Sequence, residues 1–379
     1  MDFRFTEEQI MIQKMARDFA DNEILPYCQD WDAQDIFPWD TVKKLHDLGL
    51  MTVGVPAEYG GPGLDHLAQA IAVEEIARGD AGLATTLAAS TLLAADPVYV
   101  AADDEQKKWF YGRMTEGDLA AFCLTEPGAG SDAGGLSTRC VKDGDDYILN
   151  GTKQFISNGG VAGLYTVFTT LDKSMGYKGH CAFMVDRNTS GVTIGPKEDK
   201  LGIRSSNTTQ VIFEDVRVPA KNLLGKEGEG FKICMKTLDL SRAVVAAMAV
   251  GVAQGAFECA VQYSQERQQF GQPISKFQAI QFILADMAMH VETARLLYQK
   301  ACSLQDMGLP FTQMSSLAKC WGGDAAMKVA TDAVQVYGGY GFSKEYPVEK
   351  YFRDAKIMQI FEGTAQIQRL VIASDVLKG

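Results

Sequence analysis

The pattern of apolar positions divides the chain into two helical regions with a strand-rich region between them. The sequence Thr6-Glu-Glu-Gln9 matches a capping box, and apolar residues then recur at near-helical spacing through Phe19. Asp40 is placed to cap a second helix that would end at Gly49, because glycine tolerates a left-handed stop. Further helices are predicted over 66–78, 82–95 and 105–116.

Between about 118 and 230 the residue pattern changes to short runs of β-branched and aromatic residues. These runs occupy 147–150, 164–170, 180–185 and 210–218, and clusters of Asp, Asn and Gly separate them. The pattern predicts an antiparallel β unit. No strand followed by GxGxxG and a helix occurs here, so a Rossmann nucleotide site is not expected. The glycine-rich segment 225–230 is a plausible hinge out of this unit.

The last part of the chain returns to long helical patterns, expected at 231–265, 275–307, 313–337 and 364–377. Pro310 breaks one connection and YGGYGF at 337–342 breaks another. Four helices of this length predict a bundle. The fold class is therefore α+β, with an N-terminal helical domain (1–117), a middle antiparallel β-domain (118–230) and a C-terminal four-helix bundle (231–379).

Composition and charge narrow the function classes. The 379 residues carry a formal net charge of −12, and no basic stripe stands out, so a nucleic-acid partner is not expected. The N-terminus has no signal-like pattern, and no apolar run of roughly 18 residues predicts a membrane helix. Eight single cysteines and four scattered histidines give neither a disulfide frame nor a metal site. These features favour a metal-free cytoplasmic enzyme.

Two segments suggest chemistry. CLTEPGAGSD at 123–132 could wrap backbone amides around a polar ring or phosphate, although a Gly/Pro turn with capping side chains explains it equally well. In IFEGTAQIQR at 360–369, Glu362 lies between Phe361 and Gly363. Desolvation there would raise the pKa of the carboxyl group towards neutrality and make it a competent base. The alternative is a glutamate stabilised at a helix start by the dipole.

Five motifs occur in order: LTEPGAGSD (124–132), GTKQFISNGG (151–160), ERQQFGQPI (266–274), AVQVYGGYGF (333–342) and RDAKIMQIFEGTAQIQRL (353–370). Together they resemble the acyl-CoA dehydrogenases over essentially the whole chain. The resemblance implies the domain order given above, a homotetramer, FAD as cofactor and an acyl-CoA thioester as substrate. It also implies that Glu362 removes the α-proton. Relatives that use another base carry it at the position of Ser241, which cannot serve as a carboxylate.

The resemblance further implies a set of binding residues. Asp239 and Arg242 match positions that hold the CoA pantetheine, although a helix ion pair three residues apart is the plainer interpretation. Common relatives have Trp and Thr where this chain has Phe155 and Ser157. The residues assigned to FAD are Leu124, Thr125, Gly130, Ser131, Phe155, Ser157, Arg267, Phe270, Gln278, Gln335, Gly338, Gly339, Thr364 and Gln366. Those assigned to substrate are Ser131, Asp239, Arg242 and Gly363.

Arg267, Phe270 and Gln278 match a group that grips FAD from a neighbouring subunit, which would make oligomerisation part of function. The acyl pocket is expected beside Thr86, Leu87, Ala88 and Ala89, whose small side chains suit a short or medium linear chain or a compact ring. Helix packing explains them equally well. Electron-transferring flavoprotein is the expected acceptor. The alternatives are an acyl-CoA oxidase, an enoyl-CoA reductase or a non-catalytic flavoprotein.

Overall fold

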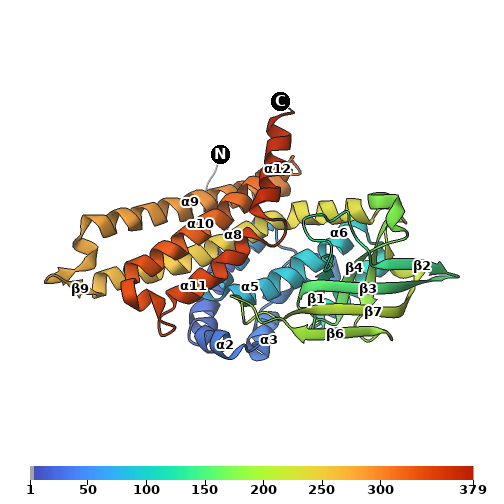
Figure 1. Cartoon of the computed structure of the whole chain (residues 1–379), viewed down its shortest axis with the longest axis horizontal. Helices are drawn as coiled ribbons and strands as arrows, with labels where there is room; N and C mark the ends of the chain where they lie inside the picture. The colour runs from blue at the N-terminus through green and yellow to red at the C-terminus, as the bar shows by residue number, and fades with distance from the viewer. Residues whose placement is uncertain (1–3, 379) are drawn as a thin grey trace.

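The computed structural model describes residues 4–378, which form a helical part, a β-sheet part and a second helical part (Figure 1). The N-terminal helices are α1 (Glu7–Phe19), α2 (Cys28–Gln34), α3 (Trp39–Asp47), α4 (His66–Gly79), α5 (Ala81–Ala88), α6 (Asp96–Ala101) and α7 (Asp104–Thr115). Two π-helices, Ala20–Ile24 and Ala89–Ala94, continue α1 and α5. The predicted helix over 82–95 is thus an α-helix that becomes a π-helix in its second half.

The start and stop signals read from the sequence are mostly confirmed. The Gln9 amide donates to Thr6 Oγ1 at 3.2 Å and the Thr6 amide donates to Gln9 Oε1 at 3.0 Å, which completes the predicted capping box. Gly49 adopts the left-handed conformation, with φ +75°. The predicted cap at Asp40 is wrong, because α3 begins one residue earlier and Pro38 occupies the cap position.

The middle part is one sheet in the order β6-β7-β3-β2-β4-β5-β8, with β1 paired to β4 (Figure 1). Its strands are β1 (Ala120–Cys123), β2 (Arg139–Asp143), β3 (Asp146–Ser157), β4 (Leu164–Thr170), β5 (His180–Asp186), β6 (Val192–Lys197), β7 (Thr208–Pro219) and β8 (Leu223–Leu224). The pairs are antiparallel, as predicted, except that β4 runs parallel to β1 and to β2. A register shift between Lys153 and Ile156 marks a bulge where β3 meets β7.

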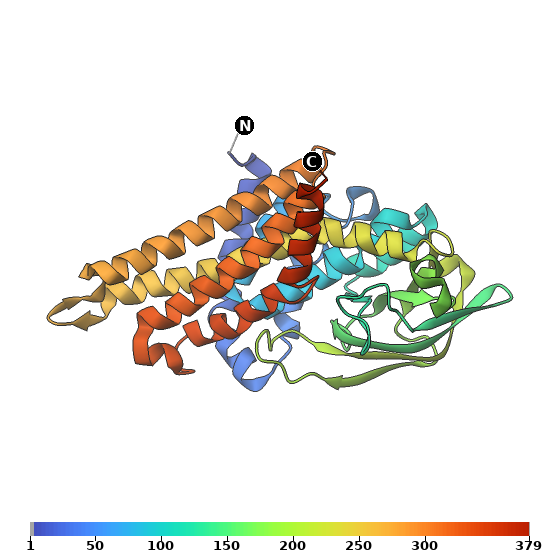
Figure 2. The same ribbon diagram turned by 45° about the horizontal axis from the view of Figure 1, so that its top comes forward.

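The C-terminal part contains the four predicted helices, α8 (Gly230–Glu266), α9 (Gln278–Asp306), α10 (Thr312–Tyr337) and α12 (Ala365–Val376). It also contains α11 (Val348–Ala355), which was not predicted, and a short hairpin of β9 (Gln268–Gln269) and β10 (Gln272–Pro273). Figures 1 and 2 show this hairpin at the end of the bundle remote from the sheet. Helix α8 packs against α4, α9 and α10 and so joins the two helical parts.

Close helix packing explains the small residues of α8. A Cβ atom on Gly251 would lie 2.2 Å from the carbonyl oxygen of Glu74 on α4, so only glycine allows this approach. Two helical stretches, 81–101 and 230–266, are long and apolar enough to span a membrane, contrary to the sequence prediction. Most of each stretch is buried inside the protein, 78% and 72% respectively, as in the core helices of soluble proteins.

Candidate active site

Glu362 lies in the turn between α11 and α12, in a backbone conformation that side chains seldom adopt. Its φ is +52°, and Gly363 follows with φ +90°. A non-glycine residue in this left-handed region is strained by about 1–3 kcal/mol, and such strain concentrates at functional sites. A Cβ atom on Gly363 would lie 2.6 Å from Nε2 of Gln368, so a side chain there would displace the Gln368 amide. The turn therefore directs Glu362 inward at the cost of backbone strain.

The carboxyl group of Glu362 faces α8 and α10, and the residue is half-buried. Ser241 on α8 donates a hydrogen bond to Oε2 of Glu362 at 2.7 Å. Burial raises the pKa of Glu362, while the hydrogen bond from Ser241 and the charges of Lys319 and Arg242 oppose this rise. The direction of the shift agrees with the predicted desolvation, and a donor and two cations favour the charged form of the carboxyl group.

Two residues that support this turn gave no signal in the sequence. Lys319 on α10 is 1% exposed, and its Nζ donates to the carbonyl oxygen of Gly363 at 2.6 Å. Burial lowers the pKa of Lys319 to about 8, with the charge of Glu362 opposing. Gln368 on α12 donates to the carbonyl oxygens of Glu362 and Gly363 at 3.2 and 3.3 Å. A lysine within a helical run predicts a solvent-exposed face, so only the fold reveals this role.

Asp239 and Arg242 form the ion pair that their spacing on α8 predicts. The pair does not lie on an open surface, because Arg242 is only 6% exposed. Asp239 also accepts a hydrogen bond from the Thr312 hydroxyl at 3.0 Å, which ties α8 to the start of α10. Arg242 acts on the Glu362 carboxyl group, so the pair borders the site. Its role in holding CoA stays a prediction.

A buried ion pair holds the loop that carries Leu124 and Thr125. Lys153 Nζ contacts Glu126 Oε1 at 2.8 Å and donates to the carbonyl oxygen of Leu124 at 3.1 Å. The carboxylate of Glu126 also accepts from the amides of Ser137 and Thr138. These donors lower the pKa of Glu126 to about 2 against the effect of its burial. The sequence reading missed this pair, which holds the loop in one conformation.

Further along the same loop, Gly130 and Ser131 are exposed, as a binding role requires. Phe155 follows on β3, at the bulge, where the Gln154 amide donates to the carbonyl oxygen of Thr125 at 2.8 Å. Phe155 has φ +57° and its ring is 63% exposed. Phe155 is therefore not part of the core of the sheet. A Cβ atom on Gly130 would meet nothing within 4 Å, so an exposed ring and an open glycine loop fit a flat, polar ring such as flavin.

Ser157 is half-buried at the end of β3, two residues beyond Phe155. Asn158 follows with φ +62°, and its side chain donates to the Thr86 carbonyl oxygen at 2.9 Å. This bond ties the end of β3, the strand that carries Phe155, to α5. Thr86, Leu87, Ala88 and Ala89 are all buried on α5 and the π-helix that follows. Their role as the floor of an acyl pocket stays a prediction.

Six predicted FAD residues lie at the remote end of the bundle, by the β9–β10 hairpin (Figure 1). Phe270 is 93% exposed with φ +51°, and the Arg267 guanidinium lies 5.2 Å from the centre of the Tyr340 ring. The six are Arg267, Phe270, Gln278, Gln335, Gly338 and Gly339, and all but the half-buried Arg267 are exposed. One chain therefore does not bring them to Leu124 and Phe155.

Thr364 and Gln366 lie at the start of α12. The Thr364 hydroxyl caps the helix by accepting from the Ile367 amide at 3.2 Å. Both residues line a cavity of about 440 Å³, together with Lys356 and Arg369. Asp324 lines the same cavity and pairs with Arg369, so Lys356 is the cation there without an acidic partner among the lining residues. Assigning the cavity to FAD stays a prediction. Among residues 4–378, no group of three or more His, Cys, Asp or Glu side chains could hold a metal ion.

An acid on a strained turn, together with an exposed aromatic ring and an open glycine loop, suits an oxidoreductase that takes a proton from carbon. Family models described as the N-terminal, middle and C-terminal domains of acyl-CoA dehydrogenase match residues 6–118, 121–216 and 228–377. The chain belongs to the acyl-CoA dehydrogenase family.

Individual relatives match along the full chain. Acyl-CoA dehydrogenase of Bacillus subtilis (strain 168) is 47% identical over 375 residues, 99% of each chain. Acryloyl-CoA reductase (NADH) of Anaerotignum propionicum is 45% identical over 381 residues, all of this chain and 96% of that protein. Butyryl-CoA dehydrogenase of Megasphaera elsdenii has a structure with TM-score 0.97, 46% identity and complete coverage of both chains.

A further solved structure, described as electron transferring flavoprotein of Acidaminococcus fermentans and concerned with flavin-based electron bifurcation, has TM-score 0.98. The chain in that structure is 47% identical to this one, and the match covers the whole of both chains.

Proposed function

We propose that this enzyme oxidises a short-chain acyl-CoA thioester to the 2,3-enoyl thioester, with Glu362 as the base. The observation that carries the proposal is the desolvated Glu362 carboxyl group, held by Ser241 at 2.7 Å on a strained turn. The similarity to butyryl-CoA dehydrogenase supports a short acyl chain. The small residues 86–89 are compatible with such a chain or with a compact ring.

Three groups of residues in this chain take part in the transfer of the α-proton. The carboxylate of Glu362 accepts the proton from the α-carbon, and its left-handed turn with Gly363 brings the backbone close to the thioester. The charges of Lys319 and Arg242 favour the ionised form of Glu362, against the effect of its burial. Closure of the site against water strengthens each of these interactions.

FAD fits the residues present: Phe155 and the loop that carries Leu124 and Thr125 would hold its ring. The flavin supplies, when bound, the acceptor for the hydride that leaves the β-carbon. We place Arg267 and Phe270 on the FAD of a second copy, because one chain holds them at the opposite end from Phe155. A homotetramer, expected from the resemblance, would complete each site in this way.

Electron-transferring flavoprotein is the proposed electron acceptor, supported by the similarity to a chain from the Acidaminococcus structure. The reverse reaction, reduction of an enoyl-CoA, is the second candidate, and the similarity to acryloyl-CoA reductase favours it. The proton transfer at Glu362 serves both directions. An acyl-CoA oxidase would require rapid reaction of the reduced enzyme with O2. A non-catalytic flavoprotein would not explain the strained backbone and raised pKa of Glu362.

The deciding experiment is anaerobic titration of the FAD-loaded enzyme with acyl-CoA thioesters of different shape. Butyryl-CoA should bleach the flavin absorbance rapidly, and longer linear, branched and cyclic thioesters should do so more slowly. Slow reoxidation by O2 and rapid reoxidation by electron-transferring flavoprotein would separate a dehydrogenase from an oxidase. Flavin that no acyl-CoA reduces would overturn the proposed function.

A further inference from the structure

A buried ion cluster joins the N-terminal and C-terminal helical parts. Lys350 on α11 contacts the carboxyl groups of Asp80 and Asp354 through its Nζ, at 2.7 Å in each case. Both acids are 0% exposed and Lys350 is 5% exposed. Asp80 immediately precedes α5, and Asp354 lies in the last turn of α11. The proposed function gives these three residues, the Asp80 cluster, no role.

The acids of the cluster also bind the loop 198–207, which joins β6 to β7 in the sheet. The Ser205 hydroxyl donates to Oδ1 of Asp80, and the Ile203 amide donates to Oδ1 of Asp354 at 2.5 Å. Ile203 has φ +46° and is 5% exposed. A β-branched residue rarely adopts this left-handed conformation, so the cluster holds the loop in a strained form.

The loop packs tightly between α5 and α11. A Cβ atom on Gly82 of α5 would lie 2.0 Å from Oγ of Ser205. A Cβ atom on Gly202 of the loop would lie 2.6 Å from the carbonyl oxygen of Arg353 on α11. The second obstacle is backbone, which cannot move aside unless the helix moves with it. The cluster therefore fixes α5, α11 and the loop as one unit.

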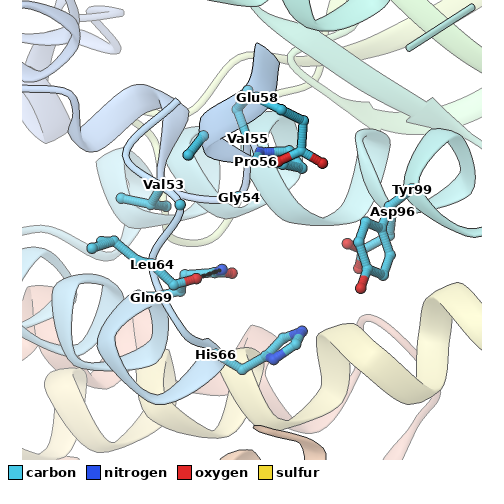
Figure 3. A pocket seen from close by; sticks show the side chains of 12 residues that line it. Val53, Gly54, Val55, Pro56, Glu58, Leu64, His66, Gln69, Asp96 and Tyr99 are labelled. Atoms are coloured by element: carbon cyan, nitrogen blue, oxygen red, sulfur yellow. Dashed lines mark hydrogen bonds between the residues drawn. The ribbon is translucent and has the colours of Figure 1, made fainter. Parts of the chain in front are cut away.

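The cluster is separate from the cavity of about 260 Å³ that Figure 3 shows. His66 and Gln69 line that cavity from the first turn of α4, whereas Asp80 follows the last turn of the same helix. Helix α4 has 14 residues, which corresponds to a length of about 20 Å. The cluster is thus a junction inside the fold and not a wall of this cavity.

The loop continues into the strand that carries Phe155. Its last residue, Asn207, accepts from the Asn158 amide at 2.7 Å through its carbonyl oxygen and from the Gly160 amide at 2.8 Å through its side chain. Asn158 directly follows Ser157, the last residue of β3. The cluster therefore reaches the proposed flavin side of the site through two hydrogen bonds of Asn207.

The two helices of the junction also continue into the site. Oδ1 of Asp80 caps α5 by accepting from the Leu83 amide at 2.7 Å, and residues 86–88 of the expected acyl pocket follow on that helix. Helix α11 leads through the 3-10 helix Lys356–Gln359 to Glu362. One buried cluster thus connects the base turn, the expected acyl pocket and the end of β3.

The turn with Glu362 has further supports outside the cluster. Ser241, Lys319 and Gln368 contact it from α8, α10 and α12. Weakening the cluster therefore leaves the turn held by three side chains, but it loosens α5 and the loop 198–207 against α11.

We propose that the Asp80 cluster positions the base turn against the end of β3, so that Asp80, Lys350 and Asp354 are positioning residues for hydride transfer. This inference rests on the proposed oxidation of acyl-CoA. Removal of the α-proton requires the substrate beside Glu362, whereas hydride transfer also requires the β-carbon to be aligned with the cofactor. A displacement of about 1 Å between reacting groups can lower a rate about 100-fold.

The test compares α-proton exchange with flavin reduction in the holoenzyme. Asp80→Asn removes one partner of Lys350 but keeps a side chain that can cap α5, and Lys350 retains Asp354. The enzyme is mixed anaerobically with butyryl-CoA in D2O. Flavin absorbance gives the rate of reduction, and mass spectrometry gives deuterium at the α-carbon. Reduction at saturating butyryl-CoA should fall at least about tenfold, while α-deuterium incorporation should stay within about threefold of wild type.

Two further variants complete the comparison. Asp354→Asn leaves Lys350 paired with Asp80 and should give the same result, so a folding defect in one variant does not decide the test. Asp65→Asn is the matched control, because Asp65 caps α4 by accepting from the Ala68 amide at 2.6 Å and its other oxygen accepts from Gln9. This control should leave both rates unchanged.

Amide hydrogen exchange of the same holoenzymes gives a measure that does not depend on catalysis. In Asp80→Asn and in Asp354→Asn, peptides that cover 198–207 should exchange faster than in wild type. Peptides that cover 360–369 should exchange as in wild type, because the three supports of the base turn remain.

Wild-type flavin reduction in both cluster variants, a parallel fall of reduction and α-exchange, or the same separation of the two rates in Asp65→Asn would each overturn the inference. Unchanged amide exchange at 198–207 in both cluster variants would also overturn it. If no acyl-CoA reduces the flavin of the wild-type enzyme, the proposed function fails instead.

Discussion

The hydroxyl group of Ser241 donates a hydrogen bond to Oε2 of Glu362 at 2.7 Å. Ser241, whose position the family resemblance assigns to the base of other relatives, therefore contacts the proposed base of this chain. The two residues are 121 positions apart, on α8 and on the turn before α12. The bond lowers the pKa of a carboxyl group that burial raises, so Ser241 sets how easily Glu362 is ionised.

Removal of the base should abolish oxidation and spare binding. Glu362→Gln keeps the size of the side chain but cannot accept the α-proton, so flavin reduction by butyryl-CoA should fall by at least about 100-fold. Stopped-flow absorbance measures the rate, and the flavin-to-protein ratio shows that FAD is retained. Glu345→Gln, at an exposed position, is the matched control. Normal reduction in Glu362→Gln would remove Glu362 from its role.

Ser241→Ala should shift the pH dependence of flavin reduction. The hydrogen bond favours ionised Glu362, so its loss should raise the pKa of Glu362 further. Hydrogen bonds to charged groups contribute about 1.5–3 kcal/mol, which corresponds to about one to two pKa units. The acidic limb of the pH profile should therefore move upward. Ser264→Ala removes a hydroxyl from the same helix and should move nothing. An unshifted limb in Ser241→Ala would contradict the role of this contact.

Lys319→Met should also raise the pKa of Glu362, as Ser241→Ala does, but through the loss of a charge. The substitution removes a cation that lowers the pKa of Glu362, and it removes the donor to the carbonyl oxygen of Gly363. The acidic limb should again move upward, and the maximal rate should fall because the turn is less firmly held. Lys328→Met removes an exposed, ion-paired lysine from α10 and is the control. If the two variants give the same pH profile, Lys319 has no electrostatic role.

The Glu126–Lys153 pair should govern stability in acid. The folded protein holds the pKa of Glu126 at about 2, below its ordinary value of 4.5, so Glu126 stabilises the fold above about pH 4.5. This contribution is lost as pH falls from 4.5 towards 2. Glu126→Gln leaves Lys153 buried and unpaired, which should cost about 3–5 kcal/mol at neutral pH. Chemical denaturation would measure it.

Adding Lys153→Met to Glu126→Gln should recover most of the stability lost in the single variant, because no buried charge then lacks a partner. No recovery in the double variant would show that the loss came from the other bonds of Glu126.

Complementation tests whether sites are built from two chains. Arg267→Ala and Glu362→Gln should each be inactive alone, the first through loss of FAD. In a mixed oligomer, the Arg267→Ala chain still supplies Glu362 and the Glu362→Gln chain still supplies Arg267. Some sites are then complete, so co-expression should restore roughly a quarter of wild-type activity, provided that subunits mix at random. Absence of any recovery would indicate that Arg267 serves its own chain.

The sequence predicted the three-part fold well because its patterns are local. Periodic apolar positions and turn residues place most elements within a few residues of their observed ends. The capping box of Thr6 and Gln9 at the start of α1 is an example. The cap at Asp40 failed because the helix starts at the preceding residue, after Pro38. The π-helix Ala89–Ala94 has no local signature that separates it from an α-helix.

The site was predicted only in part, for a related reason. Glu362 and Ser241 could be assigned through motifs that resemble a known family. Lys319 and Gln368 could not, because their importance depends on contacts with a turn that the sequence pattern does not place beside them. Lys319 looks like an ordinary helical lysine until α10 is seen to run beneath the turn at Gly363.

The π-helix Ala89–Ala94 has a further effect on everything downstream of it. Such a turn takes in one more residue than an α-helical turn, and each residue of an α-helix advances the side-chain direction by about 100°. The direction in which the side chains of α6 point is therefore set several residues before that helix begins. Shortening the π-helix by one residue would turn them by about 100° without changing any residue of α6.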